Sequence, residues 1–171
     1  MFRDQGYGRM IMVSSTSGVV GNVGQANYGA AKMGIMALAR IVAMENAAKG
    51  ITANVVLPSA DTRLTRAVPT PKDPQAAARR AERLRRSPAD AIAPLCVYLA
   101  AEQSAHVNGQ VFHQRGAELS LYSLPRPVRL VHRHGGWTPE TIAEQAMPAL
   151  APGFTPLVDD ARVLHPGLPL E

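Results

Sequence analysis

The chain has 171 residues, 46% of them hydrophobic, which is enough for one domain with a sizeable core and excludes a disordered chain. Its apolar runs are far shorter than the roughly 20 residues that cross a bilayer, and no secretory leader is recognisable, so we expect a cytoplasmic protein without membrane contact. The net charge of +5 suits phosphate-bearing ligands or nucleic acid without choosing between them, and the single cysteine, Cys96, excludes an internal disulfide.

The first elements in chain order are two buried strands joined by a long helix. Residues 10–13 and residues 53–57 are short apolar runs, and Pro58 stops the second. Between them, residues 25–49 lack proline, are rich in alanine and methionine, and precede Gly50, which is typical of a helix closed by a glycine cap. The order strand, helix, strand predicts a right-handed parallel crossover in an α/β fold, with helices on both faces of the sheet.

The long helix is unusually apolar. Between Met33 and Met44 it carries a single charge, Arg40, so more than one of its faces must be buried. We therefore expect one face to meet another copy of the chain, in a homodimer or a homotetramer.

The stretch after the second strand predicts a mobile flap. Residues 66–74 hold three prolines and few large apolar side chains, and residues 76–86 form a polar, arginine-rich helix. We expect these arginines to form a solvated face of the helix. The alternative interpretation is that they contact the phosphates of coenzyme A.

A further helix and a third strand follow. Ser87 is the expected N-cap of a helix that runs to about Ala101 and is bent by Pro94. A strand over residues 110–114 follows the turn signal Asn108-Gly109.

The composition of the sequence changes beyond Leu124, where prolines and two adjacent glycines follow. A short helix is predicted over residues 138–146. We therefore divide the chain into a domain over residues 1–124 and a C-terminal extension over residues 125–171, which we expect to pack on that domain.

Three side chains form the candidate catalytic set. Tyr28 and Lys32 are four residues apart on the predicted helix and so share one face, while Ser15 lies on the loop after the first strand. A phenol with an ordinary pKa of about 10 exchanges protons poorly near neutrality, but a neighbouring ammonium stabilises the phenolate. A serine hydroxyl would then hold a substrate oxygen while the phenol gives or takes the proton.

The segment Ser15-Thr-Ser-Gly-Val-Val-Gly-Asn-Val-Gly-Gln-Ala-Asn-Tyr28-Gly-Ala-Ala-Lys32 resembles the signature of the short-chain dehydrogenase/reductase family, a serine followed by Tyr-x-x-x-Lys. The similarity continues through Glu45, Gly50 and Asn54 to Pro58, and then as far as Gly116. It implies the C-terminal half of a Rossmann-like, doubly wound parallel sheet, followed here by an extension.

The resemblance also implies roles for individual residues. Tyr28 would be the general acid/base, Ser15 would orient the carbonyl or alcohol, and Lys32 would hold the nicotinamide ribose of NAD or NADP. Pro58, Ser59 and Thr62 would lie along the cofactor. Residues 58–65 depart from the family's usual Pro-Gly sequence and look more like the (3R)-hydroxyacyl-CoA dehydrogenase part of multifunctional β-oxidation enzymes.

One family feature is absent from the sequence. The glycine-rich turn Thr-Gly-x-x-x-Gly-x-Gly, whose backbone amides approach the cofactor pyrophosphate, does not occur here. We therefore expect the chain to represent the C-terminal catalytic part of an N-terminally truncated member.

Other polar residues favour structural roles. Asn54, inside a strand, favours satisfying neighbouring backbone groups, and Cys96 favours a buried, inert thiol. The segment His132 to His134 lacks the spacing of a zinc site, and we expect no metal. Trp137 favours a packing anchor.

Three functions follow as hypotheses. The first is hydride transfer between NAD(P) and a secondary alcohol or ketone, with a 3-hydroxyacyl thioester or a steroid-like molecule as substrate. The second is an inactive truncated remnant that acts only as an interaction module. Nucleic-acid binding rests on charge alone, without a recognised motif, and we expect none.

Overall fold

A computed structural model describes residues 1–158 and residue 163. Its contacts divide the described chain into two compact units, Met1–Ser123 and Leu124–Val158. That the extension packs on the domain stays a prediction.

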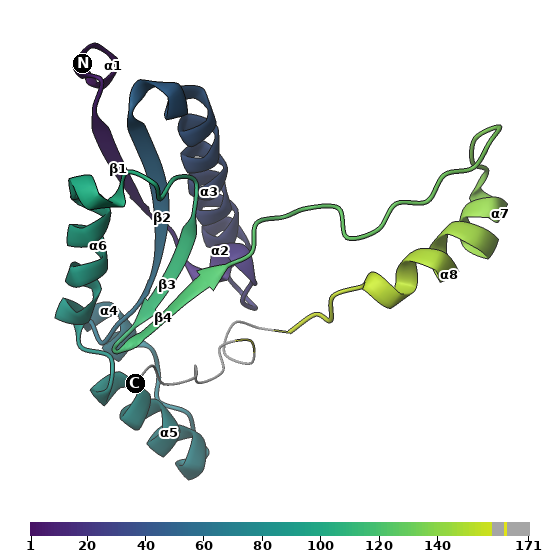
Figure 1. The fold of residues 1–171 in the computed structure, drawn as a ribbon. Coiled ribbons are helices and arrows are strands. Elements are labelled where there is room, and N and C mark those ends of the chain that lie inside the picture. Colours follow the sequence, from purple (N-terminus) through teal and green to yellow (C-terminus); the bar gives the residue numbers. More distant parts are fainter. Residues whose placement is uncertain (159–162, 164–171) are drawn as a thin grey trace, which may run out of the picture. The chain divides into compact units, whose positions relative to one another are not determined.

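A four-stranded sheet organises the first unit (Figure 1). Its strands, in spatial as well as chain order, are β1 (Gly8–Val13), β2 (Ile51–Ser59), β3 (Val111–Arg115) and β4 (Glu118–Tyr122). β1, β2 and β3 run parallel, and β4 returns antiparallel to β3. The predicted α/β class and parallel crossover are confirmed, whereas β4 was not predicted from the sequence.

The helices of the first unit are α1 (Phe2–Gln5), α2 (Thr16–Val19), α3 (Ala26–Asn46), α4 (Arg63–Ala67), α5 (Pro74–Arg85) and α6 (Ala93–Ala100). Three short 3-10 turns accompany them: η1 (Ala47–Lys49), η2 (Ala89–Ile92) and η3 (Glu102–Ser104). The predicted long helix is α3 with η1, and Gly50 closes it at a φ of 70°, in the left-handed region that favours glycine.

The core lies on both sides of β2. Every residue from Ile51 to Leu57 is buried, with α3 packed on one face of the sheet and α6 on the other (Figure 1). On the α6 side, Val56 forms a cluster with Leu95 and Leu99. Helices on both faces explain why the two first strands are continuous apolar runs instead of alternating ones.

Asn54 has the structural role that its place in a strand indicates. Its Nδ2 donates to the Val107 carbonyl at 2.8 Å, and its Oδ1 accepts from the Gln110 amide at 3.0 Å. The side chain is 1% exposed, and both contacts hold the turn that leads into β3.

Two sequence predictions near Ser87 are wrong. Ser87 does not cap a following helix, because its hydroxyl donates back to the Arg83 carbonyl at 2.9 Å, at the end of α5. Pro94 does not bend the next helix either. It lies in the first turn of α6, where a backbone amide has no intrahelical partner, so its missing N–H breaks no hydrogen bond.

The mobile loop predicted over residues 66–74, as the first part of the flap, begins later than expected. α4 extends to Ala67, so only the following residues form the loop before α5. Thr62 caps α4, its hydroxyl accepting from the Thr65 amide at 3.2 Å. This capping pair was not recognised in the sequence.

The second unit holds a mostly helical segment. It comprises α7 (Pro139–Thr141), a π-helical turn η4 (Ile142–Ala146), α8 (Met147–Leu150) and a 3-10 turn η5 (Ala151–Gly153). Thr138 caps the segment, its hydroxyl accepting from the Thr141 amide at 3.3 Å. The predicted short helix is therefore present and continues beyond residue 146. Among the described residues, no helix is long and apolar enough to cross a membrane.

Candidate active site

The end of β1 positions Ser15. The Ser14 amide donates to the Val56 carbonyl at 2.9 Å, which continues the strand pairing to the last residue before the loop. Ser15 then caps the short helix α2, its hydroxyl accepting from the Ser17 amide at 3.2 Å. The hydroxyl is therefore fixed by its own backbone at the carboxyl edge of the sheet.

Two glycines bring α2 against α3. A Cβ on Gly18 would lie 2.9 Å from the Cβ of Lys32, and a Cβ on Gly29 would lie 3.1 Å from the Ser17 carbonyl oxygen. Both distances are shorter than ordinary contacts, so larger residues would separate the helices. The close approach places the Ser15 turn beside the first two turns of α3, which carry Tyr28 and Lys32.

Lys32 is tied to the end of β1 by two contacts. Its Nζ donates to the Val13 carbonyl at 3.1 Å, and its own carbonyl accepts from the Ser14 hydroxyl at 2.7 Å. The ammonium lies 5.6 Å from the centre of the Tyr28 ring. Tyr28 is 43% exposed, and among the described residues its hydroxyl makes no hydrogen bond. The phenol is thus free to meet a substrate.

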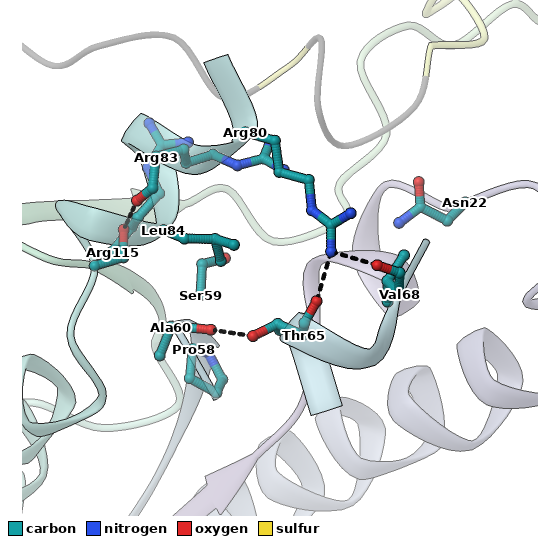
Figure 2. A pocket seen from close by; sticks show the side chains of 11 residues that line it. Asn22, Pro58, Ser59, Ala60, Thr65, Val68, Arg80, Arg83, Leu84 and Arg115 are labelled. Carbon is teal, nitrogen blue, oxygen red and sulfur yellow. Dashed lines mark hydrogen bonds between the residues drawn. The ribbon is translucent and has the colours of Figure 1, made fainter. Parts of the chain in front are cut away.

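The end of β2 supplies a second group of residues at the same edge. Parallel pairing sets Val13 beside Val56, so the segments that follow β1 and end β2 lie next to each other. Pro58 and Ser59 line a cavity of about 340 Å³ beneath α5 (Figure 2). Asn22 also lines it and donates to the Ser17 hydroxyl at 3.1 Å, which links the cavity wall to the Ser15 turn.

His113, on the neighbouring strand β3, contacts Ser59. Its Nε2 lies 3.0 Å from the Ser59 hydroxyl, and its side chain is 1% exposed. Sequence reasoning did not identify His113 as a site residue. Its position two residues after buried Val111, on the same face of β3, was the available signal.

The structure places the expected site residues in two groups. Ser15 caps α2, which contacts the helix α3 that carries Tyr28 and Lys32, whereas Pro58 and Ser59 line a cavity whose lining includes none of those three. Thr62 does not line that cavity, and its hydroxyl caps α4. The assignment of Thr62 to a cofactor therefore stays a prediction.

Arginine contacts hold the far wall of the cavity. The Arg80 guanidinium donates to the carbonyls of Thr65, Val68 and Pro69 at 2.6 to 2.7 Å, and Figure 2 shows it reaching from α5 to the end of α4. These carbonyls lie where a helix end leaves acceptors without intrahelical donors. Arg80 thus fixes α5 to α4.

An ion pair fixes the other side of α4. Arg66 donates to both carboxylate oxygens of Asp61, at 2.7 and 2.6 Å. These hydrogen bonds hold the pKa of Asp61 below its usual value, so the pair is fully charged near neutrality. Among the residues that the structure describes, no cluster of three or more His, Cys, Asp or Glu side chains is placed to hold a metal ion.

Comparisons with known proteins give matches over most of the chain. A family model described as "Enoyl-(Acyl carrier protein) reductase" matches residues 1–116. A short-chain type dehydrogenase/reductase of Mycobacterium tuberculosis is 37% identical over 123 residues, which are 72% of this chain and 39% of that protein. A hydroxyacyl-CoA dehydrogenase of the same organism is 40% identical over 134 residues, 78% of this chain and 41% of that protein.

A solved structure adds to the comparison. Full-length peroxisomal multifunctional enzyme type 2 from Drosophila melanogaster superposes with a TM-score of 0.65 at 28% identity, over 98% of this chain and 27% of that one. The α/β fold with its parallel sheet and the family match define an oxidoreductase by ancestry. The chain belongs to the short-chain dehydrogenase/reductase family. It spans about two fifths of the length of the two Mycobacterium tuberculosis relatives.

Proposed function

We propose that the chain supplies the catalytic side of a hydride transfer between NAD or NADP and a secondary alcohol or ketone. The observation that supports this most is the position of the Lys32 ammonium, held by the Val13 carbonyl and 5.6 Å from the Tyr28 ring. An exposed tyrosine beside an anchored cation, next to a serine at a strand end, is a suitable arrangement for proton exchange with a substrate oxygen.

The residues present fit the nicotinamide end of a dinucleotide. Lys32 offers an ammonium, and Pro58 and Ser59 offer a partly buried, polar wall at the carboxyl ends of adjacent parallel strands, where α/β folds bind such ligands. The sequence has no glycine-rich turn, so these residues would hold only that end. When bound, the dinucleotide supplies the hydride acceptor or donor.

Each of the three side chains has a separate task in this proposal. The Ser15 hydroxyl orients the carbonyl or alcohol oxygen of the substrate, and the Tyr28 hydroxyl takes the alcohol proton or returns it to the ketone oxygen. Lys32 stabilises the charge that Tyr28 develops and binds the ribose hydroxyls. Because Ser15 caps α2 and Lys32 bonds to Val13, little reorganisation is needed on substrate binding.

The substrate class comes from similarity. The relatives include proteins described as hydroxyacyl-CoA dehydrogenase and acetoacetyl-CoA reductase. We extend this to a 3-hydroxyacyl thioester as the first candidate for this chain, with a steroid-like alcohol as the second. A cytoplasmic location and a homodimer or homotetramer remain part of the proposal.

A second candidate function is that of an interaction module without catalysis. Three apolar side chains on α3 favour it: Leu38, Ile41 and Met44 are 54%, 53% and 73% exposed. A chain that binds through this helix, without a nucleotide, would be an inactive remnant.

Nucleotide binding separates the two functions. The 171-residue chain is titrated into NADH and into NADPH while the nucleotide fluorescence is followed. Saturable binding of either nucleotide that Lys32→Ala weakens and Lys49→Ala leaves unchanged would support the oxidoreductase. A folded chain that binds neither nucleotide would support the interaction module instead.

A further inference from the structure

Two adjoining cavities share a wall in the first unit. Both are lined by Arg80, Arg83, Ser87 and Arg115. The inner cavity, of about 340 Å³, reaches the end of β2, while the outer one, of about 1000 Å³, follows α5 toward the turn between β3 and β4. The two cavities therefore adjoin at these four residues, between the end of β2 and the turn that joins β3 to β4.

The outer cavity is strongly cationic. Five arginines and two glutamates line it, and no other charged residue does. A concave surface that is lined mostly by positive charges attracts polyanionic ligands. A phosphate-bearing molecule is the ligand class that this lining favours, because guanidinium groups match phosphate oxygens in charge and geometry.

Four of the five arginines already have protein partners: Arg79 with Asp73, Arg80 with three backbone carbonyls, Arg86 with Glu82, and Arg115 with Glu118. Arg83 is the exception. Its guanidinium makes no ion pair or hydrogen bond with any residue that the structure describes. Arg83 lines both cavities, and Figure 2 shows it among the residues of the inner one.

The acids nearby are already engaged. Glu82 accepts hydrogen bonds from both Arg85 and Arg86, which lower its pKa to about 2, and Glu118 accepts from Arg115 at 2.7 Å. Neither carboxylate is left to neutralise Arg83. The free charge at the junction of the two cavities is therefore a guanidinium.

We infer that Arg83 and the outer cavity bind the phosphates of a coenzyme A thioester. The inference rests on the proposed function for the acyl end. A coenzyme A thioester carries its reacting carbonyl at one end of a flexible arm and its phosphates at the other. The inner cavity, which Ser59 lines at the end of β2, adjoins the cationic outer cavity, so an arm from phosphates bound at Arg83 can extend toward the strand ends.

Calorimetric titration of the 171-residue chain with free coenzyme A tests the inference without turnover. Arg83→Gln is expected to weaken binding about fivefold, the size of one partly exposed charge contact. Arg83→Lys, which keeps the charge, should retain most of the affinity. Arg85→Gln is the matched control, since it removes the same charge from the same helix but Arg85 lines neither cavity. Circular dichroism verifies that each variant is folded.

Three further ligands test whether the site binds the phosphates of coenzyme A or another molecule. Pantetheine, which lacks phosphates, should bind much more weakly than coenzyme A. Equal binding of pantetheine, an equal loss in Arg85→Gln, or binding of holo-acyl carrier protein but not of coenzyme A would each overturn the inference. So would competition between NADPH and coenzyme A that is lost in Arg83→Gln, because Arg83 would then belong to the dinucleotide site.

Failure of the inference and of the proposed function are distinguishable. Hydride transfer is assayed with an acyl N-acetylcysteamine thioester, which has no phosphate. No turnover together with Arg83-dependent coenzyme A binding would sink only the proposed function. Turnover of this thioester without coenzyme A binding would sink only the inference.

Discussion

At Tyr28, removal of one oxygen atom tests catalysis without removing a contact that stabilises the fold. Its ring is 43% exposed and its hydroxyl has no hydrogen-bond partner among the described residues, so removing that oxygen costs no internal contact. The neighbouring Lys32 ammonium keeps its own anchor at Val13 whether or not the phenol is present.

Tyr28→Phe should therefore abolish turnover while leaving stability and nucleotide affinity nearly intact. A fall of about 100-fold or more is expected for loss of a general acid/base. The assay is best made in a fusion that places the part of the Mycobacterium tuberculosis hydroxyacyl-CoA dehydrogenase preceding its match in front of this chain. Tyr98→Phe, also 43% exposed, is the control. Activity of Tyr28→Phe within tenfold of the parent would remove Tyr28 from the site.

Lys32→Ala should impair two measurements at once, because one ammonium is assigned both to Tyr28 and to the ribose. Turnover in the same fusion should fall, and the Kd for NADH, measured by fluorescence, should rise. A variant that loses only turnover would restrict Lys32 to proton exchange. Unchanged values for both would contradict the assignment.

The candidate catalytic residues were predictable from the sequence because their spacing carries the information. Tyr28 and Lys32 are four residues apart, and residues at this spacing on a helix share a face, whatever the rest of the fold does. His113 was not predictable in the same way, because its contact with Ser59 joins two strands that are distant in the sequence. Arg83 was seen only as part of an arginine run, and its isolation depends on which neighbours the other arginines find.

At the scale of elements, the contact of α2 with α3 depends on small residues. Gly18→Ala should lower the free energy of unfolding by about 1–3 kcal/mol, because the added methyl would lie 2.9 Å from Lys32 Cβ and the Met33 amide nitrogen. Gly34→Ala is the matched control, since nothing lies within 4 Å of a Cβ there and alanine favours a helix by about 1 kcal/mol. Urea unfolding measures both. Equal stabilities of the two variants would contradict the packing argument.

Elements with a strong local signal were predicted well. β1, β2 and α3 follow from apolar runs, the absence of proline and the closing Gly50. β4 was missed although Gly116, at a φ of 53°, makes the tight turn before it. The error at Ser87 has a different cause: its hydroxyl had two possible partners, and the preceding helix provided the one that was not expected.

At the scale of the whole molecule, the exposed apolar residues of α3 predict self-association. Leu38, Ile41 and Met44 are more than half exposed, and burying each is worth roughly 1.5–3 kcal/mol. Sedimentation equilibrium should show a dimer or larger species at about tens of micromolar, and Ile41→Glu should shift it toward monomer. Val97→Glu, at a position 68% exposed on α6, is the control. A folded parental monomer at that concentration would contradict the prediction.

The position of β1 at the edge of the described sheet has a consequence for amide hydrogen exchange. The Ser14 amide points to β2. Because successive residues of a strand form their backbone hydrogen bonds on alternate sides, the amides of Met10 and Met12 also point to β2, while those of Ile11 and Val13 point away from it. In the 171-residue chain, exchange should thus be slow at every second amide of β1 and fast at the others. Slowing of the fast set would report the moment at which another strand, from any source, pairs with this edge.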